Sequence, residues 1–128
     1  MAMHKVELER RTKDFALRVI RFVARLPKNK VTDVLGYQML KAGTSVGANY
    51  REANRAESRA HFIHKIAIVE KEIAETQYWL ELFGNVDHGD VVEQRALLKE
   101  SSELLSIFTA IGKSTKARNP KFAIGNSK

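Results

Sequence analysis

The side chains that could do chemistry in this 128-residue sequence are mainly basic, with 22 Lys and Arg against 15 Asp and Glu and a formal charge of +7. One row advances in steps of three and four, as residues on one face of a helix do; it comprises Arg11, Asp14, Arg18, Arg21, Arg25 and Lys28. A row of cations can contact the phosphates of a nucleic acid. It can also be a solvated outer face whose long side chains cover apolar surface, and both interpretations stay open.

A second group of cations lies near the end of the chain, because residues 113–128 hold five Lys and Arg and no acid. Residues 61–112 are acidic instead, with four Lys and Arg against nine Asp and Glu. Basic surfaces favour a polyanionic partner. We therefore predict nucleic-acid contacts for Arg11, Arg18, Arg21, Arg25, Lys28, Lys113, Lys116, Arg118 and Lys121.

A shorter basic row is formed by Arg51, Arg55 and Arg59, with Glu52 and Glu57 nearby. We interpret this row mainly as a source of ion pairs, either within one subunit or between subunits. Contact with nucleic acid is the alternative.

The remaining reactive groups do not combine into a catalytic or metal-binding set. Glu72 and Glu75 could do acid–base work, but carboxylates beside apolar residues are more often partners of arginines. His61 and His64 lack carboxylates at metal-ligand spacing, and the Glu-x-x-His pairs of di-iron bundles are absent. There is no cysteine, no Walker loop and no GxGxxG, GxSxG or HExxH motif. We therefore expect no enzyme, and no bound cofactor or metal.

Hydrophobic spacing predicts an all-α fold, with helices near residues 12–26, 32–56, 59–83 and 91–111 and no sheet. The residues expected to cap helix starts are Thr12, Thr32, Ser58 and either Asp87 or Asp90. Those expected to end helices are Pro27, Gly84 and Gly112. Short breaks favour antiparallel neighbours, so we predict an up-and-down antiparallel four-helix bundle over residues 1–112. Residues 113–128 are predicted to form a basic tail.

The segment 59–83 carries the clearest pattern. Its core stripe comprises Phe62, Ile66, Val69, Ile73, Thr76, Leu80 and Phe83. A second stripe on the opposite side of the same helix comprises Ile68, Glu72, Glu75, Trp79 and Leu82. A helix that is apolar nearly all round is normally buried. We predict that this second stripe, called the interface stripe below, contacts another subunit; burial under helix 91–111 or the tail is the alternative.

Two features of helix 32–56 indicate close packing. Gly43 and Gly47 form a GxxxG pair, which allows another backbone to approach closely or the helix to bend. Asn49 lies on the seam that faces the core, and a buried amide needs hydrogen-bond partners. We expect a structural polar contact from Asn49 to Thr76 or Gln77.

Residues 45–82 resemble the signature of the small four-helix-bundle proteins encoded in intervening sequences of bacterial 23S rRNA genes, a ribosomal-protein-like family. The matching positions are Ser45, Gly47, Asn49, Glu52, Ala53, Ser58, Phe62, Glu72, Glu75, Thr76, Tyr78, Trp79 and Leu80. A looser similarity extends from Phe15 to Leu105. The resemblance implies an up-and-down bundle and, as in known relatives, a ring-shaped homopentamer. Distant relatives are accessory proteins of diversity-generating retroelements, which bind nucleic acid and a reverse transcriptase.

Together these features predict a non-enzymatic, oligomeric protein that binds nucleic acid, RNA in particular. The alternative is an oligomeric scaffold whose partner is another protein, such as a reverse transcriptase. The absence of cysteine fits a reducing cytoplasm. No apolar run reaches the roughly 18 residues that span a bilayer, so we expect a cytoplasmic protein without a membrane partner.

Overall fold

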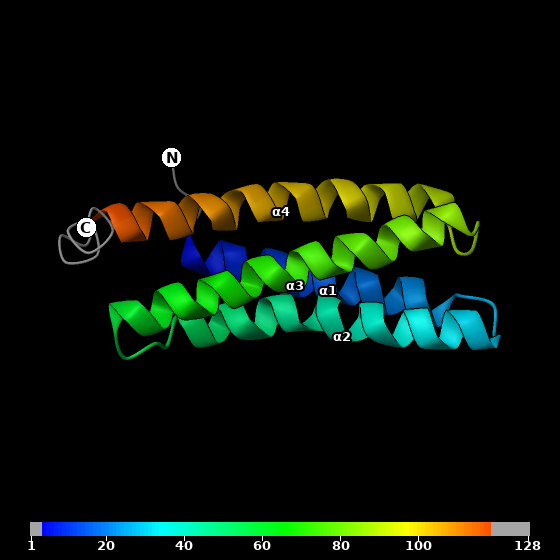
Figure 1. The fold of residues 1–128 in the computed structure, drawn as a ribbon, viewed down its shortest axis with the longest axis horizontal. Helices are drawn as coiled ribbons and strands as arrows, with labels where there is room; N and C mark the ends of the chain where they lie inside the picture. The colour runs from blue at the N-terminus through cyan, green and yellow to red at the C-terminus, as the bar shows by residue number, and fades with distance from the viewer. Residues whose placement is uncertain (1–3, 119–128) are drawn as a thin grey trace, which may run out of the picture.

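Four helices form an up-and-down antiparallel bundle in the computed structural model, which describes residues 4–118 (Figure 1). They are α1 (Lys5–Ala24), α2 (Lys30–Ala53), α3 (Arg59–Asn85) and α4 (Val91–Arg118). No strand occurs within the described range. The predicted all-α bundle is therefore confirmed. The helix α3 packs closely on both α2 and α4, and the seam between α1 and α4 is the sparsest of the four between neighbouring helices.

Two predicted helix starts are wrong. The first helix begins at Lys5 rather than after Thr12, whose fully buried hydroxyl donates to the Leu8 carbonyl oxygen at 2.9 Å. A mid-helix threonine can satisfy its hydroxyl in this way, so it need not mark a terminus. The second helix is capped by Asn29, and Thr32 supplies the other half of a capping box.

The other two helix starts agree with the sequence. Ser58 caps α3, because its hydroxyl oxygen accepts a hydrogen bond from the His61 backbone N–H at 3.0 Å. The Asp90 carboxylate accepts one from the Glu93 backbone N–H at 3.0 Å, at the start of α4. Both caps were predicted from residue type alone.

The glycines expected to end helices lie inside them instead. Gly84 is within α3, and the turn that follows uses positive φ angles at Asp87 (59°) and Gly89 (92°). Gly112 is buried within α4, where an added Cβ would lie 3.3 Å from the Glu70 carboxylate of α3. Its role is close helix packing, so α4 continues to Arg118. The beginning of the predicted tail is therefore helical.

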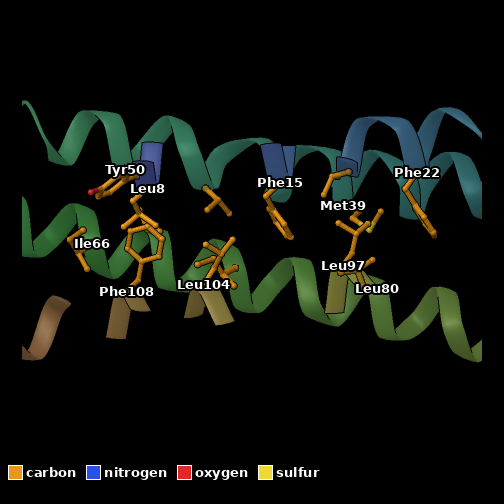
Figure 2. Packing of buried hydrophobic residues seen from close by; sticks show 14 of the residues in the cluster. Leu8, Phe15, Phe22, Met39, Tyr50, Ile66, Leu80, Leu97, Leu104 and Phe108 are labelled. Carbon is orange, nitrogen blue, oxygen red and sulfur yellow. The ribbon is translucent and has the colours of Figure 1, made fainter. Parts of the chain in front are cut away.

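The hydrophobic core runs along the whole bundle (Figure 2). Two edge-to-face aromatic pairs bridge helices within it, Phe22 with Phe83 at 5.6 Å and Tyr50 with Phe108 at 5.0 Å between ring centroids. The predicted core stripe of α3 is buried from Ile66 to Phe83. Phe62, at the start of that stripe, is only half-buried.

The GxxxG pair of α2 faces α1. A Cβ added at Gly43 would lie 2.9 Å from both Val19 methyl groups, and one at Gly47 would lie 3.2 Å from the Thr12 hydroxyl oxygen. These distances leave little or no room for a side chain. The two glycines therefore let α1 lie close against α2.

Candidate nucleic-acid interface

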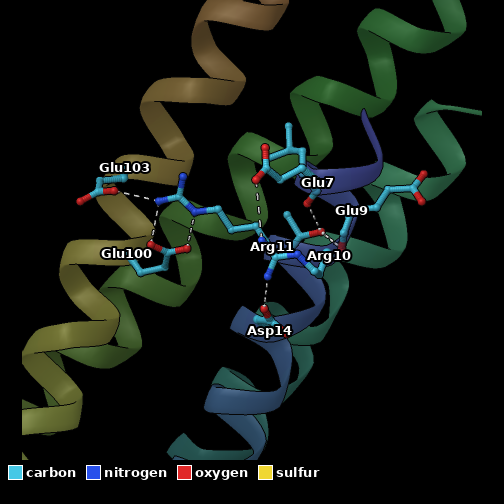
Figure 3. Close-up of polar contacts among 9 residues, drawn as sticks. Glu7, Glu9, Arg10, Arg11, Asp14, Glu100 and Glu103 are labelled. Carbon is cyan, nitrogen blue, oxygen red and sulfur yellow. Dashed lines mark hydrogen bonds and ion pairs between the residues drawn. The ribbon is translucent and has the colours of Figure 1, made fainter. Parts of the chain in front are cut away.

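The first part of the predicted basic row on α1 is engaged by acids of α4 (Figure 3). The Arg11 guanidinium donates from Nε and Nη2 to the two carboxylate oxygens of Glu100, at 2.7 and 2.8 Å. Nη2 also donates to Glu103 at 2.8 Å. The hydrogen bond with Glu100 raises the pKa of Arg11 above its ordinary value. Phosphate binding by Arg11 would have to displace these contacts.

Arg18 is engaged in the same way further along the helix. Its Nε donates to the Glu93 carboxylate at 3.0 Å. Glu93 also belongs to α4, so Arg11 and Arg18 both pair α1 with acids of α4. Part of the predicted basic row thus has a structural role, because it joins α1 to α4.

The last three members of the row, Arg21, Arg25 and Lys28, are exposed. None of them forms an ion pair with another residue in the range 4–118. Arg21 and Arg25 nevertheless share a pocket with Asp90 and Glu93 of the α4 start. The local charge is therefore close to balanced, which weakens this end of the row as a phosphate site.

A denser group of cations lies at the opposite end of the bundle, where the α2–α3 loop and the last turns of α4 meet (Figure 1). Lys113 and Lys116 are exposed there on α4, as are Arg51, Arg55 and Arg59 around the loop. We call these five residues the basic end. Within the part of the chain that the structure describes, none of the five forms an ion pair.

The structure differs from the sequence interpretation of the shorter basic row. Among residues 4–118, Arg51, Arg55 and Arg59 form none of the expected intrasubunit ion pairs, and Glu52 pairs with Lys65 at 2.6 Å instead. Ion pairs between subunits stay a prediction. The spacing of residues in the sequence could not reveal which cation pairs with Glu52, because the pairing depends on how α2 packs on α3. Of the predicted tail residues, Arg118 ends α4 and Lys121 lies outside the described residues.

The interface stripe of α3 is half-buried at all five positions. The Lys65–Glu52 ion pair places this side of α3 beside α2, rather than under α4. Trp79 packs against the core cluster, and its Nε1 is buried without a hydrogen-bond acceptor. Burial raises the pKa of Glu72, and the neighbouring Glu75 adds to the shift. Contact of this stripe with another subunit stays a prediction.

The expected contact between Asn49 and α3 is not formed. The Asn49 amide donates to the Ser45 carbonyl oxygen at 2.9 Å, and the Thr76 hydroxyl donates to the Glu72 carbonyl oxygen at 2.8 Å. Each side chain is thus satisfied by the preceding turn of its own helix. Gln77 instead donates to the Ser102 hydroxyl of α4 at 3.1 Å.

Residues 4–118 contain neither a cluster of metal ligands nor a helix suited to span a membrane. No group of three or more His, Cys, Asp and Glu side chains there is arranged to hold a metal ion. None of the described helices is both long and apolar enough to cross a membrane.

These features define a small up-and-down four-helix-bundle protein in which acids of α4 pair with α1 and five cations gather at one end. The model of the 23S rRNA-intervening sequence protein family matches residues 4–110, and the chain belongs to that family. A solved structure of a protein with unknown function from the S23 ribosomal protein family of Bacteroides thetaiotaomicron is similar, with a TM-score of 0.80. The two chains are 34% identical, over 87% of this chain and 99% of the other. No curated protein matches the chain.

The contacts of Arg11 predict a structural role for that residue. Arg11→Gln should lower the free energy of unfolding by about 2 kcal/mol, because it removes charge-assisted hydrogen bonds and leaves Glu100 partly buried without its partner. Urea denaturation followed by circular dichroism measures the change. Arg10→Gln is the matched control, since its pairs with Glu7 and Asp14 are exposed and should contribute less than about 0.5 kcal/mol. Equal losses in the two variants would contradict the assignment.

The environment of Glu72 predicts a pH-dependent effect. Because the pKa of Glu72 is raised in the folded state, its contribution to stability is present below the unfolded pKa and is lost as pH rises through the folded one. Glu72→Gln should therefore stabilise the protein at pH 7, and the gain should vanish below about pH 4. Thermal unfolding at both pH values tests this, with exposed Glu81→Gln as the control. A gain that does not depend on pH would argue against burial as its cause.

Proposed function

We propose that this protein is a non-enzymatic, oligomeric, cytoplasmic protein that binds RNA through the basic end. The observation that carries the proposal is the gathering of five exposed cations from α2, α3 and α4, none with an ion-pair partner in the described range. Of the acids near the α2–α3 loop, Glu52 is already paired with Lys65, Glu9 accepts a hydrogen bond from the Asn54 amide, and Glu57 is exposed. The local excess of positive charge is therefore available to an external polyanion.

The proposed binding mode is electrostatic. Phosphates that contact Lys and Arg release condensed counterions, so affinity comes with little sequence preference and falls steeply as salt increases. Arg21, Arg25 and Lys28 could add contacts, but nearby acids reduce their contribution. Arg11 and Arg18 are assigned to the α1–α4 seam rather than to RNA.

We further propose that copies of the chain associate through the interface stripe, and the resemblance to the family points to five copies in a ring. The half-buried stripe and the unpartnered Trp79 Nε1 support an additional covering surface. A ring would repeat the basic end around its circumference. Weak contacts would then add through a high effective concentration.

A second candidate function, as a scaffold for another protein, is favoured by the opposite half of the bundle. Nearly all exposed large apolar side chains of residues 4–118 lie in this half of the bundle, including Val31, Val34, Tyr37, Tyr78, Val86, Val91 and Val92. Protein partners commonly cover such surfaces. A reverse transcriptase is one partner that the family resemblance suggests.

The RNA-binding proposal predicts that the two ends of the bundle contribute unequally to RNA affinity. Replacing Arg51, Arg55 and Arg59 together by Gln should weaken binding to every RNA sequence similarly. The log–log salt dependence should also flatten, by roughly 0.7 for each lost phosphate contact on a single strand. Fluorescence anisotropy over a salt series measures both changes.

The matched control replaces Arg21, Arg25 and Lys28 by Gln, which removes the same number of charges from the other end. This variant should lose less affinity. Equal losses would mean that net charge alone governs binding. Absence of RNA binding by the unaltered protein at about 50 mM salt, where such contacts are strong, would favour the scaffold function.

The assembly proposal predicts that a charge at Trp79 separates the subunits. Trp79→Glu should reduce the mass measured by light scattering while retaining most of the helical circular dichroism signal, because an interfacial charge is costly to desolvate. Val6→Glu is the control, since Val6 is 76% exposed and lies outside the stripe. A monomeric mass for the unaltered protein at micromolar concentration would refute the assembly.

A further inference from the structure

A shallow, open depression lies within the basic end, between the α2–α3 loop and the last turns of α4. It has a volume of about 420 Å³ and is lined by Ala56, Glu57, Ser58, Arg59, Phe62 and Thr115. We propose that this site takes up one unpaired nucleobase of single-stranded RNA. The inference rests on the proposed RNA binding and adds that the bound RNA is a single strand rather than a duplex.

The apolar wall of the site is Phe62. Its ring packs against the core cluster and is half-buried, and it also lines the site. A ring held in this way can stack on a base without further loss of side-chain freedom. Stacking tolerates any sequence, because every base has a π face. Phe22 lines a pocket beside Arg21 and Arg25 on α1, but it is only 3% exposed.

The polar walls can bond the edge of a base. The Ser58 hydroxyl oxygen accepts from the His61 backbone N–H at 3.0 Å, which leaves its own O–H as a donor. The Thr115 hydroxyl donates to the Ile111 carbonyl oxygen at 2.8 Å, which leaves its oxygen as an acceptor. The exposed Glu57 carboxylate is a second acceptor. The site therefore offers both hydrogen-bond donors and acceptors to the edge of a base.

The charge of the site matches the nucleotide backbone. Arg59 lines the site, is exposed, and has no ion-pair partner within residues 4–118. Its guanidinium can contact a phosphate next to the inserted base, and other cations of the basic end can contact its neighbours. Bases stacked within a duplex cannot enter such a site, whereas unstacked bases of loops and single strands can.

The experiment compares a single-stranded RNA of about ten nucleotides with a duplex of equal length by fluorescence anisotropy. Phe62→Leu keeps an apolar side chain against the core but removes the π face. We expect it to weaken single-strand binding about tenfold and duplex binding less than about twofold. Tyr37→Leu, which removes a 63% exposed aromatic ring of α2 from the opposite half, should change neither. Unchanged helicity by circular dichroism confirms that each variant is folded.

A second measurement uses the unaltered protein and a single-stranded RNA that carries 5-iodouracil. Photocrosslinking should attach the RNA to the tryptic peptide spanning residues 60–65, which contains Phe62. Crosslinks confined to other peptides, or equal effects of Phe62→Leu on single strand and duplex, would overturn the nucleobase site while leaving RNA binding intact. Failure of the unaltered protein to bind either RNA form would overturn the site and the proposed function together.

Discussion

Burial of one apolar stripe of α3 is the constraint on which the rest of the bundle depends. Ile66, Val69, Ile73, Leu80 and Phe83 are almost fully removed from water, and at roughly 25 cal/mol per Å² such burial is the main favourable contribution to folding. Because this stripe must face the centre, the flanks of α3 are turned towards α2 and α4. Lys65 then meets Glu52, and Gln77 meets Ser102. The polar contacts between helices follow from the apolar ones.

The same constraint decides which charges are free to meet a partner. Once α1 and α4 are brought side by side, the acids of α4 meet Arg11 and Arg18. The cations around the α2–α3 loop lie beyond the reach of those acids. Five unpaired cations therefore gather around the α2–α3 loop, while others within residues 4–118, such as Arg21, Arg25 and Lys28, are exposed elsewhere. The proposed functions of the two halves of the bundle, one basic and one with exposed apolar side chains, both follow from this arrangement.

The sequence predicts well what a single helix determines. The number of helices, the core stripe of α3 and the Ser58 and Asp90 caps follow from spacing and residue type within a few turns. What depends on a neighbouring helix was predicted poorly. Gly112 looked like a helix end because its packing against Glu70 is not visible in the sequence. The row on α1 looked like a free phosphate-binding face because its partners lie some 75 to 92 residues away. Thr12 looked like a cap for a different reason, since a threonine that bonds the preceding turn of its own helix has the same residue type as one that caps a terminus.

The sparse contact between α1 and α4 has a consequence for how the bundle responds to salt. This seam relies on ion pairs more than the other seams do. Salt screens such pairs, while strongly excluded salts such as sulfate strengthen apolar burial. Ionic strength therefore acts on the α1–α4 seam more than on the others. Because α1 also packs along α2 and buries Phe15, Val19 and Phe22 in the shared core, salt tunes how tightly two neighbouring helices are joined while the core holds all four together.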